Sequence, residues 1–132
     1  MRRTKQITAW VENRPTQLAR LAKALAKAKI NITAFAAYGA GSESPVRLLV
    51  KNPAKARKAI QPLGVRVTEE DVLRLTLPEK PGQLAAIAER LAEQNINIEY
   101  AYETVAARAK QADLVLAVSD LAGAMKALRG FH

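Results

Sequence analysis

One segment of this chain occurs twice, and this repeat limits the possible folds more than any other feature. Residues 15–32 align with residues 81–98 without a gap, at an offset of 66 residues, and 10 of the 18 positions are identical. The identical pairs are Pro15/Pro81, Gln17/Gln83, Leu18/Leu84, Ala19/Ala85, Ala22/Ala88, Leu25/Leu91, Ala26/Ala92, Ile30/Ile96, Asn31/Asn97 and Ile32/Ile98. An internal repeat of this kind marks a repeated structural unit, so we expect two copies of one unit.

Each copy begins with a pattern typical of a strand followed by a helix. Alternating apolar residues predict strands over residues 7–12 and 72–77. Pro15 and Pro81 then suit a first helical turn, where the missing N–H costs nothing. Leucine, isoleucine and alanine recur afterwards at i, i+3, i+4 and i+7, which predicts one apolar stripe facing a sheet. We expect these residues to be buried against the sheets: Leu18, Leu21, Leu25, Leu84, Ile87 and Leu91.

The rest of each copy predicts two more strands, a short helix and, in the first copy alone, a last strand. The expected segments are 31–38, 46–51, 53–63 and 64–68 in the first copy and 97–104, 114–118 and 121–128 in the second. The offset grows to 68 at the third strand, so the second hairpin is expected to be two residues longer. We place the boundary after residue 69, which gives units of residues 1–69 and 70–132.

The repeated turn also resembles a known family. The two segments are Asn13-Arg14-Pro15-Thr16-Gln17-Leu18 and Glu79-Lys80-Pro81-Gly82-Gln83-Leu84, and each precedes a helix that ends in Ile-Asn-Ile. A strand, then x-x-Pro-Gly-x-Leu, then such a helix resembles the ACT domain, over nearly the whole chain. The resemblance implies an α+β fold of two ferredoxin-like βαββαβ units, whose antiparallel sheets carry helices on one face. It also implies a protein that binds an amino acid and regulates a metabolic enzyme.

The turn before each repeated helix is the best candidate for a ligand site. Unpaired N–H groups at a helix start carry the positive end of the helix dipole and suit a carboxylate. In ACT domains that bind amino acids, an asparagine before x-Pro-Gly contacts the ligand, and Asn13 matches it. Glu79 stands at that position in the second copy, and Thr16 replaces the glycine that is kept as Gly82.

Both turns are equally well explained as simple helix caps, and Asn31 and Asn97 as helix-stop residues. Tyr100 and Tyr102 could line an aromatic pocket, although core packing is the simpler interpretation. The candidate ligand-binding residues are Asn13, Arg14, Pro15, Thr16, Gln17, Leu18, Asn31, Ile32, Glu79, Lys80, Gly82, Gln83, Leu84, Asn97 and Ile98.

The charge is concentrated in the first half of the chain. Residues 1–66 hold 14 Lys/Arg and 2 Asp/Glu, whereas residues 67–132 hold 7 and 10. Such a basic half suggests an anionic partner, and a ferredoxin-like nucleic-acid-binding protein is therefore the alternative function. Arg20, Lys23 and Lys27, however, form one stripe typical of a solvated helix face. RNA-binding modules also need aromatic residues for base stacking on the central strands of the open sheet face. The expected central strand, residues 46–50, has none, and only Trp10 is suitably placed on its neighbour, so nucleic acid is not the favoured partner.

Few residues suggest catalysis or metal binding. The chain has no cysteine, one histidine, His132, and three serines in a loop and a helix cap. No nucleophile has a base nearby and no spacing suits a metal, so we expect no enzyme activity, metal or cofactor. No apolar run approaches the ~20 residues of a membrane span, and we expect a cytoplasmic protein.

The expected function is therefore that of a regulatory sensor that binds a small amino acid and acts through assembly or through contact with a metabolic enzyme. A homodimer is the expected assembly. Trp10, Phe35 and Leu49 are expected on the open sheet face, where they would form an apolar patch that a second copy covers. The missing last strand leaves an edge that also invites cover.

Overall fold

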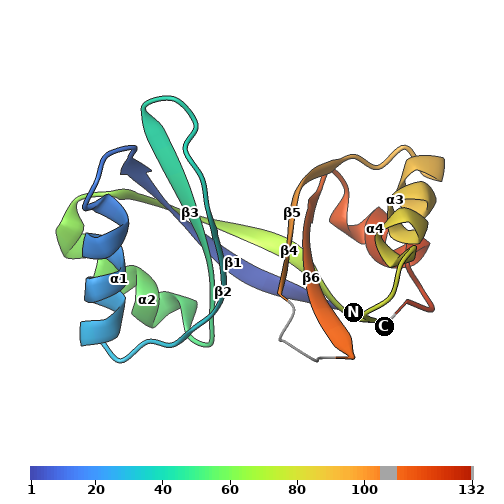
Figure 1. Ribbon diagram of the computed structural model, residues 1–132, viewed down its shortest axis with the longest axis horizontal. Coiled ribbons are helices and arrows are strands. Elements are labelled where there is room, and N and C mark those ends of the chain that lie inside the picture. Colours follow the sequence, from blue (N-terminus) through green and yellow to red (C-terminus); the bar gives the residue numbers. More distant parts are fainter. Residues whose placement is uncertain (105–109, 132) are drawn as a thin grey trace. The chain divides into compact units, whose positions relative to one another are not determined.

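A computed structural model of the chain describes residues 1–104 and 110–131 (Figure 1). The contacts between residues divide the chain into two compact units. The N-terminal unit is Lys5–Glu70, and the C-terminal unit combines Met1–Thr4 with Asp71–His132. The lone histidine, His132, lies outside the described residues. Each unit is described in turn.

The N-terminal unit has the βαββαβ order that the sequence predicts, with helices on one face of an antiparallel sheet (Figure 1). Its neighbouring strands follow the order β2-β3-β1-β4, and β3 pairs antiparallel with both β1 and β2. Its elements are β1 (Arg2–Glu12), α1 (Gln17–Lys27), β2 (Ile32–Ala37), β3 (Glu43–Val50), α2 (Pro53–Ile60), a 3-10 turn η1 (Gln61–Leu63) and the beginning of β4 (Arg66–Pro78).

The C-terminal unit repeats this order but lacks a last strand of its own. After the second part of β4 come α3 (Gln83–Glu93), β5 (Ile98–Thr104), β6 (Gln111–Val118) and α4 (Leu121–Ala127). Among the described residues, no strand follows α4. The strand order is β1-β4-β6-β5, and Met1–Thr4 belong to this unit. The first residues of β1 therefore occupy the position of the missing strand beside β4.

The strand registers show that the second hairpin is the longer one. Thr8 lies opposite Arg47 in the first unit, whereas Arg74, 66 residues after Thr8, lies opposite Val115. Val115 follows Arg47 by 68 residues. The two added residues fall in the connection between β5 and β6, which includes residues 105–109 outside the described part of the chain.

Each sheet packs one face against its helices, and the alternation of the sequence decides which residues face inward. Ile7, Ala9 and Val11 of β1 are buried with Leu21 and Leu25 of α1. The C-terminal unit repeats this core with Leu73, Leu75 and Leu77 of β4 against Ile87 and Leu91 of α3. These matches confirm the predicted strand faces and most of the predicted helix stripe.

Two of the six leucine and isoleucine residues predicted to be buried are exposed. Leu18 is 46% exposed and Leu84, its equivalent, is 54% exposed. The reason is the width of the sheet. Leu18 lies over β2, the last strand on its side, so no further strand covers its outer surface. An apolar pocket of about 160 Å³ remains there, between α1 and β2.

The prediction that Phe35 lies on the face away from the helices is wrong. The register of β2 against β3 shifts between Ile32 and Ala34, which marks a bulge. Phe35 is consequently opposite Leu48, a residue of the helix-facing core, and lines the pocket beneath Leu18. Leu49 does lie on the other face, but it is buried.

The helices are short. The longest, α1 and α3, have 11 residues each. Within the described part of the chain, no helix combines the length and the hydropathy that a membrane crossing requires.

Two substitutions in α1 should separate core packing from edge packing. Leu25 is fully enclosed, so Leu25→Ala leaves a cavity and should lower the free energy of unfolding by roughly 2–5 kcal/mol. Leu18→Ala, about two turns earlier, should cost under about 1 kcal/mol, because half of that side chain is already in water. Urea denaturation measures both values. Equal losses in the two variants would contradict this assignment of the core.

Candidate functional site

A small cleft opens at the turn between β1 and α1. It has a volume of about 240 Å³ and lies where the end of β1, the start of α1 and the loop between β2 and β3 meet. Its lining residues are Val11, Glu12, Asn13, Arg14, Gln17, Leu18, Ala37, Tyr38, Gly39 and Ser44. Four of the residues predicted from the first repeated turn, Asn13, Arg14, Gln17 and Leu18, thus line one cleft.

Asn13 is held in place by the loop that faces it. Its backbone N–H donates to the carbonyl of Ser42 at 2.9 Å, and its Nδ2 donates to the carbonyl of Gly41 at 3.0 Å. A Cβ atom on Gly39 would lie 2.7 Å from Nδ2, so only glycine permits this close approach. The side chain is therefore positioned, and its Oδ1 can accept a hydrogen bond from a ligand.

Two further polar side chains line the same cleft. Gln17 is only 6% exposed, and its Oε1 accepts a hydrogen bond from Arg20 at 3.4 Å. The guanidinium of Arg14 pairs with the carboxylate of Glu12 at 2.6 Å, and both side chains are exposed. Exposed pairs contribute about 0–1 kcal/mol, so Arg14 can turn toward a bound carboxylate at little cost.

The start of α1 faces this turn with its positive end uncompensated. Its first turn contains no acidic residue, and no side chain caps it. Thr16 precedes the helix in the left-handed conformation, with φ of 78°. A β-branched residue is strained there, whereas the equivalent Gly82, with φ of 91°, is not.

The other predicted residues of the first copy do not join the cleft. Pro15 and Thr16 are part of the turn but are not among the lining residues. Asn31 and Ile32 lie at the start of β2, whereas the cleft is formed at its other end, by Ala37 and the following residues. The helix itself ends before Asn31, at Lys27, and Lys29 then adopts a left-handed conformation with φ of 59°.

The second repeated turn has the same backbone path as the first. Glu79 donates its N–H to the carbonyl of Lys110 at 2.8 Å, as Asn13 does to Ser42, and Lys80 donates to Pro78 at 3.0 Å, as Arg14 does to Glu12. Gln83 and the exposed Leu84 begin α3 after Gly82. Residues 105–109, which precede Lys110 in the chain, lie outside the described part.

Asn97 and Ile98 lie at the far end of β5 from this turn. The backbone N–H of Asn97 donates to the hydroxyl of Ser119 at 3.0 Å, and the N–H of Ser119 donates back to the carbonyl of Asn97 at 3.0 Å. Ile98 pairs with Val118 at the start of β5. This pair of contacts gives Asn97 a structural role in joining β5 to β6.

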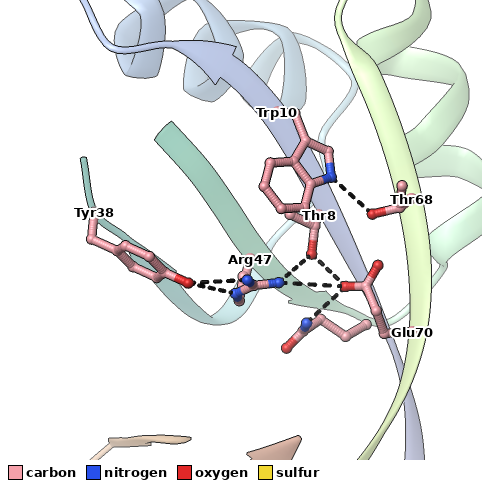
Figure 2. A network of polar contacts seen from close by, with 7 residues as sticks. Thr8, Trp10, Tyr38, Arg47, Thr68 and Glu70 are labelled. Carbon is pink, nitrogen blue, oxygen red and sulfur yellow. Dashed lines mark hydrogen bonds and ion pairs between the residues drawn. The ribbon is translucent and has the colours of Figure 1, made fainter. Parts of the chain in front are cut away.

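Tyr38 is one of the lining residues that the sequence did not predict. It lies just after β2 and faces the cleft, and its hydroxyl accepts hydrogen bonds from Nε and Nη2 of Arg47, at 3.3 and 3.0 Å (Figure 2). The repeat could not single it out, because the equivalent residue, Thr104, is not aromatic. Tyr38 therefore connects the cleft with a second group of residues.

That group is a polar network on the sheet face away from the helices. Arg47 is 8% exposed, and its Nη1 donates to Thr8 at 3.2 Å and lies 3.9 Å from Glu70 (Figure 2). Glu70 also accepts hydrogen bonds from Thr8 and Gln6. The network therefore joins β1, β3 and β4 with Tyr38, and it gives this buried arginine the partners that a buried charge needs.

Trp10 borders the network on the same face, as the alternation of β1 predicts. It is half-buried, and its indole N–H donates to Thr68 at 3.0 Å (Figure 2). The guanidinium of Arg66 lies 4.5 Å from its ring centroid, and that of Arg47 lies 5.7 Å away. Cation–π contacts of this kind stabilise the ring in its place.

The C-terminal unit carries an ion pair instead on the corresponding strands. Arg74 donates from Nε to Asp113 at 3.0 Å, and the hydroxyl of Thr76 donates to the same carboxylate at 2.7 Å. Burial raises the pKa of Asp113, but the hydrogen bonds from Arg74 and Thr76, with the charge of Arg2, outweigh it, so this pKa lies below its ordinary value of 3.8.

The cleft can form hydrogen bonds with a ligand and recognise its charged groups. Its side chains are amides, one guanidinium, one carboxylate and the hydroxyls of Tyr38 and Ser44. The hydroxyl of Ser44 donates to the carbonyl of Tyr38 at 2.9 Å. Across the described residues, no group of three or more His, Cys, Asp and Glu side chains is placed to hold a metal ion.

Comparisons with known proteins agree with the repeat. The sequence model of the family described as "ACT domain pair" matches residues 2–122. No curated protein matches the chain. Among solved structures, protein BT0572 from Bacteroides thetaiotaomicron is similar, with a TM-score of 0.88 and 27% identity over 97% of this chain and 88% of that one.

Aspartate kinase regulatory subunits share the fold. The ligand-free regulatory subunit from Thermus thermophilus has a TM-score of 0.71 and 17% identity, covering 96% of this chain and 91% of that one. The regulatory subunit from Thermus flavus has a TM-score of 0.69 and 18% identity, covering 95% and 88%.

Two reciprocal substitutions, one in each turn, test the backbone strain at Thr16. Thr16→Gly should raise the free energy of unfolding by about 1 kcal/mol, because the left-handed strain of roughly 1–3 kcal/mol is relieved and the greater freedom of unfolded glycine offsets part of it. Gly82→Thr should lower it by about 1–3 kcal/mol. A Cβ on Gly82 meets no atom within 4 Å, so backbone strain alone causes the loss. Stabilisation by Gly82→Thr in urea denaturation would refute this.

The Arg74–Asp113 pair should make stability depend on acid pH. A folded-state pKa below the unfolded value means that Asp113 stabilises the fold above pH 3.8 and loses this effect as the pH falls through the folded-state pKa. The difference in unfolding free energy between the natural chain and Asp113→Asn should therefore be greatest near neutrality and shrink below about pH 4. A difference that stays constant from neutral to acid pH would show that the pair has no such effect.

Proposed function

The chain belongs to the ACT domain family, as a pair of ACT domains, and from this membership we propose that it is a non-catalytic regulatory protein that binds a small amino acid. A small-molecule-binding regulatory role agrees with the family and with the regulatory subunits of aspartate kinase that share its fold. We further propose that the ligand is an amino acid, that it binds at the β1–α1 turn, and that its binding acts on a partner.

The observation that carries the proposal is the cleft at the β1–α1 turn. Its volume of about 240 Å³ is below the roughly 300–1,000 Å³ usual for drug-sized ligands and suits a smaller metabolite. It combines a positioned amide, that of Asn13, with an uncapped helix start. An amino acid carries two opposite charges on one carbon, and a site for it needs a donor and an acceptor set close together.

We place the ligand carboxylate toward the first turn of α1, beside Arg14. The helix dipole and the unpaired N–H groups favour an anion there, and no acidic residue of the first turn competes. The ammonium then lies near Oδ1 of Asn13, which can accept its hydrogen bond. Gln17, which also lines the cleft, would contact the ligand between these two groups. In the second copy, Glu79 would hold the ammonium by charge.

Occupancy of the cleft would act on a partner rather than drive a reaction. The cleft offers no nucleophile with a base beside it, and its hydroxyl groups are held by neighbouring backbone and by Arg47. The regulated partner is a metabolic enzyme of the cytoplasm, in keeping with the regulatory subunits that share the fold. No cofactor is needed for this role.

We also propose that the chain forms a homodimer. The expected open-face patch does not support it, because Leu49 is buried and Phe35 faces the helices. Exposed apolar residues lie instead beside the edge strand β2, where Leu18 and Phe35 line the apolar pocket, and at the start of α3, where Leu84 is exposed. A second copy would cover them and pair the free edge strands.

The alternative, a nucleic-acid-binding protein, rests on the basic first half alone. Base stacking would need Trp10 as a platform. The guanidinium of Arg66 already lies over that ring, and the indole is fixed by Thr68. The structure thus gives a reason to prefer the amino-acid hypothesis.

The proposal is tested with a thermal-shift panel of the twenty amino acids, followed by calorimetry with the one that stabilises the chain. Asn13→Ala should weaken binding about tenfold or more, because it removes a hydrogen bond to a charged group. Glu79→Ala should do so if the second turn also binds. Asn31→Ala, at the other end of β2, is the control and should leave the affinity unchanged. Unchanged affinity in both Asn13→Ala and Glu79→Ala would exclude this placement of the ligand.

A further inference from the structure

The pocket between α1 and β2 is lined by hydrocarbon side chains alone. The lining residues are Leu18, Leu21, Ala22, Leu25, Ile32, Phe35, Val46 and Leu48. Its volume is about 160 Å³. An apolar cavity of about 150 Å³ lined by Leu, Ile and Phe stays dry and accepts benzene. The pocket therefore has room for one branched or aromatic side chain, and its lining gives a polar group nothing to hydrogen-bond.

This pocket adjoins the cleft at the β1–α1 turn. Leu18 lines both hollows. On β2, Ala37 lines the cleft, and Phe35, two residues earlier on the same strand face, lines the pocket. On β3, Ser44 and Val46 are related in the same way. One groove thus runs along α1, polar at the start of the helix and apolar farther along.

We propose that the ligand of the cleft is an amino acid with an apolar side chain, and that this side chain lies in the pocket. The inference rests on the proposed function. With its carboxylate toward α1 and its ammonium near Asn13, the ligand has its side chain left to extend past Leu18 into the adjoining pocket.

The chemistry of the pocket decides which side chains fit. About half of the side chains of Leu18 and Phe35 is in water, and an apolar group between them and the core removes part of this surface from water. A polar or charged side chain would instead give up its hydrogen bonds to water and gain none from the lining. The pocket therefore selects for apolar side chains and against polar ones of the same size.

Comparison of the two copies identifies Phe35 as the residue that determines this specificity. At the equivalent positions of the C-terminal unit, Ala101 replaces Phe35, and every other lining position keeps an aliphatic residue. The entrance differs too, because the exposed Glu103 replaces Ala37. The aromatic wall and the uncharged entrance therefore belong to the N-terminal unit.

The first test compares ligands on the full-length natural chain by calorimetry. The apolar probes are leucine, isoleucine, valine, methionine and phenylalanine, and the polar probes are asparagine, aspartate and lysine. The tightest ligand should be one of the apolar probes. It should bind at least about tenfold more tightly than alanine, because a single methylene in an apolar pocket changes affinity by roughly tenfold or more. Leucine should likewise bind at least about tenfold more tightly than asparagine, whose side chain has nearly the same shape but is polar.

The second test fills the pocket in one copy and makes the same change in the other as a matched control. Ala22→Leu places a larger side chain in the lining, and Ala22 is exposed, so the helix tolerates it. This variant should bind the tightest apolar amino acid at least about tenfold more weakly, yet bind alanine as before, because the alanine methyl group does not reach the pocket. Ala88→Leu, its equivalent in α3, should change neither affinity.

Removal of the aromatic wall provides an independent variant. Phe35→Ala copies the residue found in the C-terminal unit and should weaken binding of the same apolar amino acid by about tenfold, again without affecting alanine. Because more than half of Phe35 is exposed, this variant should remain folded, and a circular dichroism spectrum that matches that of the natural chain establishes this.

The outcomes separate this inference from the proposed function. Tightest binding of a polar probe overturns the apolar pocket and leaves the proposal of an amino-acid ligand standing, whereas binding of no amino acid overturns both. Equal losses in Ala22→Leu and Ala88→Leu also overturn the pocket. If Ala22→Leu weakens self-association in sedimentation velocity and leaves ligand affinity unchanged, a side chain of a second copy fills the pocket, and the inference is wrong.

Discussion

The packing of two helices on one face of a small sheet is the constraint on which this structure depends. A unit of this size buries little apolar surface, so each inward position of the helix and of the first strand must be filled. Leu21 and Leu25 meet Ile7 and Ala9 in one unit, and the repeat rebuilds this contact in the other. The helix can lie flat only if the chain turns sharply after β1, and that turn forms the candidate site.

The faces away from the helices follow no such common rule, and there the two copies differ. In the N-terminal unit a buried arginine, Arg47, is satisfied by Thr8, Tyr38 and Glu70. In the C-terminal unit the equivalent strands carry the Arg74–Asp113 pair. A buried charge is costly unless its hydrogen bonds are complete, so each network had to change as a whole. Tyr38 belongs both to the Arg47 network and to the cleft and so connects the two.

The sequence predicts the fold well because the repeat, the helical spacing and the strand alternation agree with one another. The sequence predicts the turn that borders the cleft for the same reason. The sequence-based prediction fails for residues whose burial is decided by neighbours that are distant in the chain. Leu18 has a core spacing but lies at the edge of a four-stranded sheet, and a bulge turns Phe35 to the helix side. Tyr38 enters the cleft from the opposite hairpin, which no local pattern connects with Asn13.

Duplication explains why these differences are tolerated. Both copies keep the turn that the core requires, as the matching hydrogen bonds of Asn13 and Glu79 and the left-handed residues before each helix show. The side chains in the turn are under no such constraint. The N-terminal copy keeps an asparagine fixed against Gly39 and Gly41 and accepts strain at Thr16, whereas the C-terminal copy relaxes the strain with Gly82 and places a carboxylate at the first position. A strained residue persists only where its surroundings hold it, and in the N-terminal copy the hydrogen bonds of Asn13 to Ser42 and Gly41 fix the turn that contains Thr16. The two turns therefore share a backbone and differ in the chemistry that they present to a ligand.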